Sequence, residues 1–173
     1  MHVRRIVTGH DKQGHSVFVS DTAAPRATNF EDLPGYGIAQ LWATEPGQPE
    51  THDLTQASGS LIPGPGGTSL LMVSLPPDTV MAAPIDPQRL VAQMIESLPG
   101  LLETFEAQDP AMHRSPTLDY GVLLEGELWL ELDNGEQRLL KPGDVVIQHG
   151  TRHAWRNRSG QVAKALFFMV GTA

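Results

Sequence analysis

The feature that most constrains the fold is a series of short apolar segments, separated by turn residues, along the last third of the chain. The expected strands are residues 120–125, 127–132, 136–140, 144–148, 153–157 and 163–170. Turns such as Asp133-Asn134-Gly135 and Lys141-Pro142-Gly143 join them. Many short strands closed by Gly, Pro and Asn turns indicate a sandwich or barrel rather than an open parallel sheet. With 17 glycines and 14 prolines in 173 residues, the chain as a whole favours strands over long helices.

Residues 1–80 are expected to add further strands and loops to the same domain. The expected elements are a hairpin of residues 3–7 and 16–20 and strands at 37–44 and 69–75. Pro76-Pro77 ends the last of these strands, because proline cannot donate to a β-ladder. The polar stretch 45–60 shows no clear period and is predicted to be a crossing loop.

One helix is predicted at residues 86–98. Asp86 is a suitable N-cap and Pro87 a suitable first helical residue. An apolar stripe follows at helical spacing, formed by Leu90, Val91, Met94, Ile95 and Leu98. Such a stripe ordinarily faces a core, so we expect this helix to lie against the barrel.

Composition excludes several classes of function. A formal net charge of −8 argues against nucleic-acid binding, which draws its affinity from clustered basic residues. Cysteine is absent, which excludes disulfides and thiolate metal sites and fits a reducing compartment. There is neither an apolar signal region nor an apolar run long enough to span a bilayer. We therefore expect a cytoplasmic protein with one domain, residues 1–173, and no membrane or nucleic-acid partner.

The C-terminal part resembles the cupins. Their first motif has two histidines one residue apart, an acidic residue and then L-x-G-E, and residues 113–127 read HRSPTLDYGVLLEGE. Their second motif runs from Gly-Asp to His and Asn, and residues 143–157 read GDVVIQHGTRHAWRN. The resemblance implies an all-β, double-stranded β-helix (jelly-roll) barrel. The cupin motifs would occupy residues 112–170, with one helix inserted before them.

The resemblance also implies a site at the mouth of the barrel, where cupins commonly hold a divalent ion such as Fe, Mn, Ni or Zn. His113 matches the first histidine of the motif, Asp119 the acid and His153 the last histidine. Ser115 stands where the second histidine is expected, and serine is a poor ligand for such ions. Two histidines and one carboxylate still form a set that holds non-haem iron. Binding of one divalent ion by His113, Asp119 and His153 is therefore left as an open alternative.

Without a metal, His153 and Asp119 would form an acid/base pair, with His113 in support. A histidine near its ordinary pKa, held by a buried carboxylate, moves protons near neutral pH. In the alternative, Asp119 only orders His153 by hydrogen bonds. Strand alternation and the motif position suggest further substrate-binding candidates. These are Trp155, Asn157, Ser115, Gln40 and Trp42.

The resemblance thus implies a cupin enzyme that acts on a small organic molecule, either a hydroxylated aromatic, a polyketide-like or a sugar-like compound. Lyase, dehydratase, isomerase or decarboxylase chemistry is favoured. A metal-dependent dioxygenase of the non-haem iron type and a non-catalytic ligand-binding cupin stay open as alternatives, because fold does not determine chemistry. Cupins commonly form homodimers, sometimes by exchanging an N-terminal strand, and residues 1–20 are the candidate for that exchange.

Overall fold

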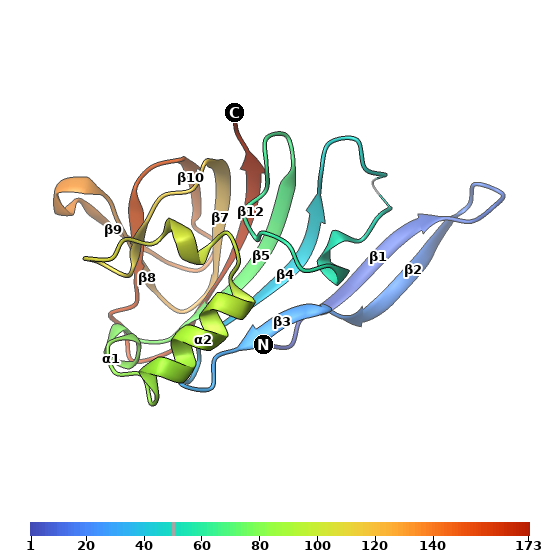
Figure 1. Ribbon diagram of the computed structural model, residues 1–173. Coiled ribbons are helices and arrows are strands. Elements are labelled where there is room, and N and C mark those ends of the chain that lie inside the picture. The colour runs from blue at the N-terminus through green and yellow to red at the C-terminus, as the bar shows by residue number, and fades with distance from the viewer. Residues whose placement is uncertain (50) are drawn as a thin grey trace.

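The computed structural model describes residues 1–49 and 51–173 and places most strands in two antiparallel sheets (Figure 1). The larger sheet has the order β10-β7-β12-β5-β4-β3. Its strands are β10 (Val145–His149), β7 (Thr117–Glu125), β12 (Ala163–Gly171), β5 (Thr68–Leu75), β4 (Gly37–Thr44) and β3 (Arg26–Asn29). The smaller sheet comprises β6 (Met112–His113), β11 (His153–Arg156), β8 (Leu128–Glu131) and β9 (Gln137–Leu140). This arrangement confirms the predicted double-stranded β-helix.

Alternation along the strands builds the barrel interior. In β7, Thr117, Asp119 and Leu123 are buried, whereas Tyr120 between them is exposed. The turn from β7 into β8 depends on Gly126, which has a φ of 78°. A Cβ atom at this position would lie 2.9 Å from the backbone of Ala163, so glycine is required here both for conformation and for space.

The predicted helix is α2 (Pro87–Ser97), and the Asp86 carboxylate caps it by accepting hydrogen bonds from the amides of its first turn. The apolar stripe packs only in part. Leu90 and Leu98 are buried, but Val91 and Ile95 are 53% and 62% exposed. Only the part of the apolar stripe that contains Leu90 and Leu98 is therefore packed, and the part with Val91 and Ile95 faces solvent.

Shorter helices occupy the connections between strands. They are α1 (Asp78–Met81), η1 (Leu54–Gln56), η2 (Leu102–Thr104) and η3 (Asp133–Gly135). The stretch 45–60, predicted to be a loop, contains η1, and its residue 50 lies outside the described residues. Among the residues that the structure describes, no helix has the length and apolar character needed to cross a membrane.

The predicted N-terminal hairpin consists of β1 (Arg4–His10) and β2 (Ser16–Ala23), which pair antiparallel with each other as a separate two-stranded sheet. It extends away from the rest of the fold (Figure 1). Arg5 ties its base to η1, because its guanidinium donates to Asp53 at 2.7 Å and to Thr55 at 2.9 Å. Phe18 and Val19 near the tip are 78% and 58% exposed.

Candidate active site

A cavity of about 330 Å³ lies between the two sheets. Ile38 and Leu71 of the larger sheet, Leu90 and Met94 of α2, and Phe105 contribute to its apolar wall. The volume is at the lower end of the range for small-molecule sites. Apolar walls of this kind favour the uncharged body of a small organic ligand, since burial of such a ligand removes apolar surface from water.

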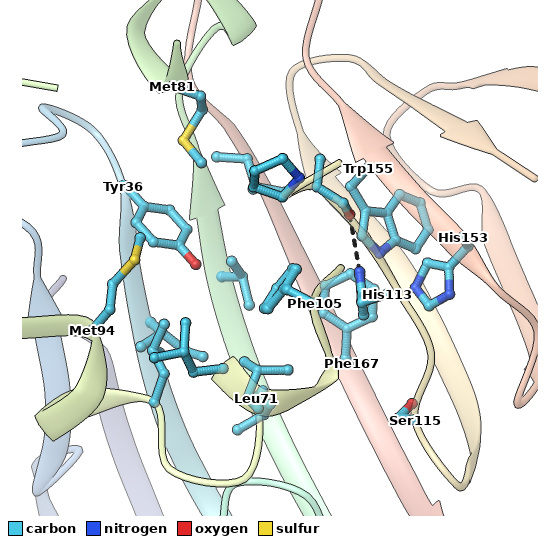
Figure 2. Close-up of a pocket in the computed structure, with 18 of the residues that line it drawn as sticks. Tyr36, Leu71, Met81, Met94, Phe105, His113, Ser115, His153, Trp155 and Phe167 are labelled. Carbon is cyan, nitrogen blue, oxygen red and sulfur yellow. Dashed lines mark hydrogen bonds between the residues drawn. The ribbon is translucent and has the colours of Figure 1, made fainter. Parts of the chain in front are cut away.

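The cavity has one polar end, at which the cupin motifs meet. Five polar side chains line it: His113, Ser115, Asp119, Gln148 and His153. They come from β6, β7, β10, β11 and the segment before β7. Figure 2 shows His113, His153 and Ser115 on one side of the cavity, with Tyr36, Met81 and Met94 on the other. A ligand in this cavity therefore meets hydrogen-bonding groups mainly at one of its ends.

The two histidines lie side by side because β6 and β11 pair with His113 opposite His153. Their ring centroids are 4.2 Å apart. In each ring Nδ1 contacts a backbone carbonyl oxygen, that of Ala111 at 3.1 Å (dashed in Figure 2) and that of Thr151 at 2.9 Å. A carbonyl oxygen only accepts, so Nδ1 carries the proton in both rings. The Nε2 lone pairs are consequently available for a ligand.

Both imidazoles are neutral near pH 7. Burial, and then the neighbouring His113, lower the pKa of His153 to about 4. Burial also lowers the pKa of His113. The expectation that His153 keeps its ordinary pKa was therefore wrong, because the surroundings of the ring oppose a positive charge.

Asp119 is 5% exposed, and burial raises the pKa of its carboxyl group although the hydroxyls of Thr117 and Ser115 lower it. Its Oδ1 atom is buried and has no hydrogen-bond partner within residues 1–49 and 51–173. The predicted hydrogen-bonded His153–Asp119 pair is not formed, since the Thr151 carbonyl takes the place of the carboxylate at Nδ1. Asp119 and His153 nevertheless line the same cavity.

Among the predicted substrate-binding residues, Trp155 and Ser115 line the cavity. Trp155 packs on Phe167 with ring centroids 5.3 Å apart. The Ser115 Oγ lies 2.7 Å from the Thr117 Oγ1. Both residues therefore lie where a ligand would contact them, and their role in substrate binding stays a prediction.

The structure places the other three substrate-binding candidates outside the cavity lining. Asn157 follows the end of β11 and bonds to backbone groups. The Gln40 side chain donates a hydrogen bond to the Ser69 hydroxyl and accepts one from the Arg26 guanidinium. A β-bulge lies between Gln40 and Trp42, and the Trp42 ring packs under the Arg5 guanidinium instead. Alternation fails here because a bulge resets the face that a strand presents.

Sequence reasoning missed two polar residues of the cavity. Gln148 is 3% exposed, and neither its amide oxygen nor its amide nitrogen has a hydrogen-bond partner. Tyr36 stacks on Phe30 at a centroid distance of 4.6 Å, and burial raises the pKa of its hydroxyl to about 12. The alternation of β10 alone signals that Gln148 faces inward, whereas no sequence pattern marks Tyr36.

The histidines and the carboxylate are suitable donor types for the divalent ion that the cupin fold implies. Their arrangement does not fit it. Within residues 1–49 and 51–173, no group of three or more His, Cys, Asp or Glu side chains could hold a metal ion. The divalent ion expected at His113, Asp119 and His153 stays a prediction, because binding it would require these side chains to move closer together.

Fold and motif site together define a cupin, and comparison with known proteins agrees. The family model described as Cupin domain matches residues 102–169. A cupin-domain-containing oxidoreductase, srdB of Neurospora crassa, is 31% identical over 167 residues, which are 96% of this chain and 71% of that protein. The chain belongs to the cupin family.

Two further similarities add context. Phomopsin biosynthesis cluster protein D of Diaporthe leptostromiformis is 36% identical over 158 residues, which are 90% of this chain and 70% of that protein. A solved RmlC-like cupin with a double-stranded β-helix fold from Methanocaldococcus jannaschii has a TM-score of 0.40 at 14% identity and covers 62% of this chain and 73% of its own. Relatives of this chain are thus cupin-domain oxidoreductases and biosynthesis cluster proteins.

Proposed function

We propose that the chain is an enzyme that moves a proton on a small, largely apolar molecule bearing a carbonyl group, as an isomerase, dehydratase or lyase does. One observation carries this proposal. Two neutral imidazoles have their Nε2 atoms available in the same cavity as a buried acid, and the other walls of this cavity are mostly apolar. Such a site is suited to general acid–base chemistry.

In the proposed reaction, the Nε2 atom of His153 accepts a proton from a C–H group next to the substrate carbonyl. The electron pair of that bond forms a carbon–carbon double bond, and the π electrons of the carbonyl group move to its oxygen. Asp119, whose carboxyl pKa is raised by burial, donates a proton when protonated, either to this oxygen or to a departing hydroxyl group. In an isomerisation, His153 returns its proton to another atom of the substrate, and Asp119 takes back the proton from the enol oxygen. In a dehydration, the hydroxyl group leaves as water with the proton from Asp119, and the proton on His153 then passes through solvent to Asp119.

The low pKa of His153 limits the substrates. A base with a pKa of about 4 removes protons efficiently only from acidic C–H groups, such as those that a carbonyl activates. The apolar walls add a second limit, because a polyol would lose its water without gaining enough partners. A hydroxylated aromatic or polyketide-like compound fits both limits better than a sugar-like one.

Solvent-deuterium exchange tests the proposal without knowledge of the product. The protein is incubated in D₂O with a panel of hydroxylated aromatic ketones, and deuterium uptake beside the carbonyl is followed by NMR. We expect His153→Gln and Asp119→Asn to lower the enzyme-dependent rate by about 100-fold or more. His149→Gln is the matched control, since His149 is exposed at the end of β10. Equal rates in His153→Gln and the unsubstituted protein would contradict the proposal, and saturable binding without exchange would indicate a ligand-binding cupin.

A metal-dependent oxidoreductase is the second candidate, and the oxidoreductase names of several relatives favour it. Elemental analysis of protein purified without an affinity tag or chelator separates the two candidates. Near-stoichiometric Fe, Mn, Ni or Zn that is lost in His153→Ala would support the oxidoreductase. Under the proton-transfer proposal, chelator-treated protein keeps its deuterium-exchange activity.

A further inference from the structure

Gln148 is a buried polar group that the proposed proton transfer does not use. Its side chain lines the cavity and is 3% exposed. Both of its polar atoms, Nε2 and Oε1, are buried without a hydrogen-bond partner in the part of the chain that the structure describes. Buried amides are almost always hydrogen-bonded in proteins, because an unpaired one loses its contacts with water and gains nothing in return. A side chain in this state is suited to a partner that comes from outside the chain.

The surroundings of Gln148 show why the fold does not satisfy its amide. Its direct neighbour across the β10–β7 ladder is Asp119, and residues paired in this way point to the same face of a sheet. The Oδ1 atom of Asp119 also lacks a partner. Ser115 and Thr117, the nearby hydroxyl residues, are bonded to each other at 2.7 Å. Gln148 therefore adds a free donor and a free acceptor to the polar end of the cavity.

A primary amide has a specific complement. It offers one donor and one acceptor side by side in one plane, so it pairs best with a group that presents an acceptor beside a donor. Neutral carboxamides, lactams and carbonyls that carry an adjacent hydroxyl group have this pattern. A carboxylate does not, because it has acceptors but no donor. A purely apolar ligand would leave the amide unpaired.

We propose that Gln148 is a specificity-determining residue that binds the carbonyl and adjacent donor of the ligand through two hydrogen bonds. The inference deepens the proposed function and rests on it for the choice of this cavity as the ligand site. Because Gln148 and His153 line the same polar end, a carbonyl held by Gln148 keeps its neighbouring C–H groups at the end where the imidazoles lie.

Three probes of similar shape test this role by isothermal titration calorimetry. Benzamide has a carbonyl with an adjacent N–H donor, acetophenone has the carbonyl alone, and cumene has neither group. In Gln148→Leu we expect the Kd of benzamide to rise about tenfold. The Kd of acetophenone should rise by less, and that of cumene should change by no more than about twofold. Gln148→Met, which keeps the length of the side chain, should behave in the same way. Gln108→Leu is the matched control, because Gln108 is exposed.

A thermal melt of the ligand-free variants gives a second readout. Replacing the unpaired amide by an apolar group should leave the melting temperature of Gln148→Leu equal to or above that of the unsubstituted protein. A clearly lower melting temperature would show that the amide serves the fold, and would overturn the proposal. Unchanged benzamide affinity in the folded variant, or no benzamide binding by the unsubstituted protein up to its solubility limit, would also overturn it.

The outcome is independent of catalysis, because binding is measured without turnover. If benzamide selectivity depends on Gln148 but deuterium exchange does not depend on His153, the proton-transfer proposal fails alone. If exchange depends on His153 but selectivity is insensitive to Gln148, the recognition role of Gln148 fails alone.

Discussion

Replacement of Asn157 by aspartate tests whether this motif residue serves the fold rather than the ligand. The Asn157 side chain is buried, and its Nδ2 donates to the carbonyl oxygens of Leu75 at 2.8 Å and Gln161 at 2.7 Å. Its Oδ1 accepts from the amide and hydroxyl of Ser159. Aspartate has the same shape, but it turns an acceptor oxygen toward the two carbonyl oxygens. Two part-buried acceptors then lose their donor, at about 1–3 kcal/mol each.

We therefore expect Asn157→Asp to lower the free energy of unfolding by about 2–6 kcal/mol at pH 7. Urea denaturation measures this loss, and a slope of about 2 kcal/mol per molar predicts a midpoint shift of roughly 1–3 M. The loss should shrink at acidic pH, because a protonated carboxyl group regains one donor. Asn134→Asp is the matched control, since Asn134 is exposed in a turn with a φ of 60° that aspartate tolerates.

A loss smaller than about 1 kcal/mol for Asn157→Asp would refute this reasoning, because the two carbonyl oxygens would then have found other donors. Ligand binding offers an independent check. Under conditions in which the variant is folded, its ratio of benzamide to cumene affinity should equal that of the unsubstituted protein. A changed ratio would return Asn157 to the ligand site.

Three further predictions follow from the site and the surface. Between pH 7 and pH 4.5 the unfolded chain protonates His153 near pH 6.5 but the folded chain only near its lowered pKa of about 4. The free energy of unfolding therefore decreases as the pH falls. Urea denaturation at both pH values should show a decrease that is about 2–3 kcal/mol smaller in His153→Gln than in the unsubstituted protein. Ser115→His restores the second motif histidine, so we expect elemental analysis to show more bound metal than in the unsubstituted protein, and equal contents would contradict this. Sedimentation velocity should show a homodimer that Phe18→Asp weakens, because the β1–β2 hairpin exposes Phe18; a monomer before substitution would refute it.

Much of the fold could be predicted from local rules. The strand expected at residues 37–44 is β4, and the helix expected at 86–98 is α2 with Asp86 as its cap. Turn residues and caps act over a few neighbouring positions, so the chain itself contains the information that places these elements. The burial of α2 was less predictable. Which part of its apolar stripe packs depends on how the helix lies across the barrel.

The site could be predicted only where a motif residue points into the barrel from a regular strand. His113, Asp119 and His153 were found in this way, and all three line the cavity. The prediction failed for Trp42, where a bulge intervenes. It also failed for the hydrogen bonding and pKa of His153, because the carbonyl that meets Nδ1 and the depth of burial depend on the packed structure.

Ser115 shows how one departure from the motif changes the kind of site that the barrel presents. A histidine there would add a third imidazole to the polar end of the cavity. The serine hydroxyl instead bonds to Thr117, and both hydroxyls act on the Asp119 carboxyl group. The imidazoles keep their Nε2 atoms available, and Asp119 and Gln148 keep unpartnered polar atoms. The polar end consequently presents hydrogen-bond donors and acceptors to a ligand, and for this reason we expect recognition of a neutral carbonyl compound and proton transfer to occur at the same end of the cavity.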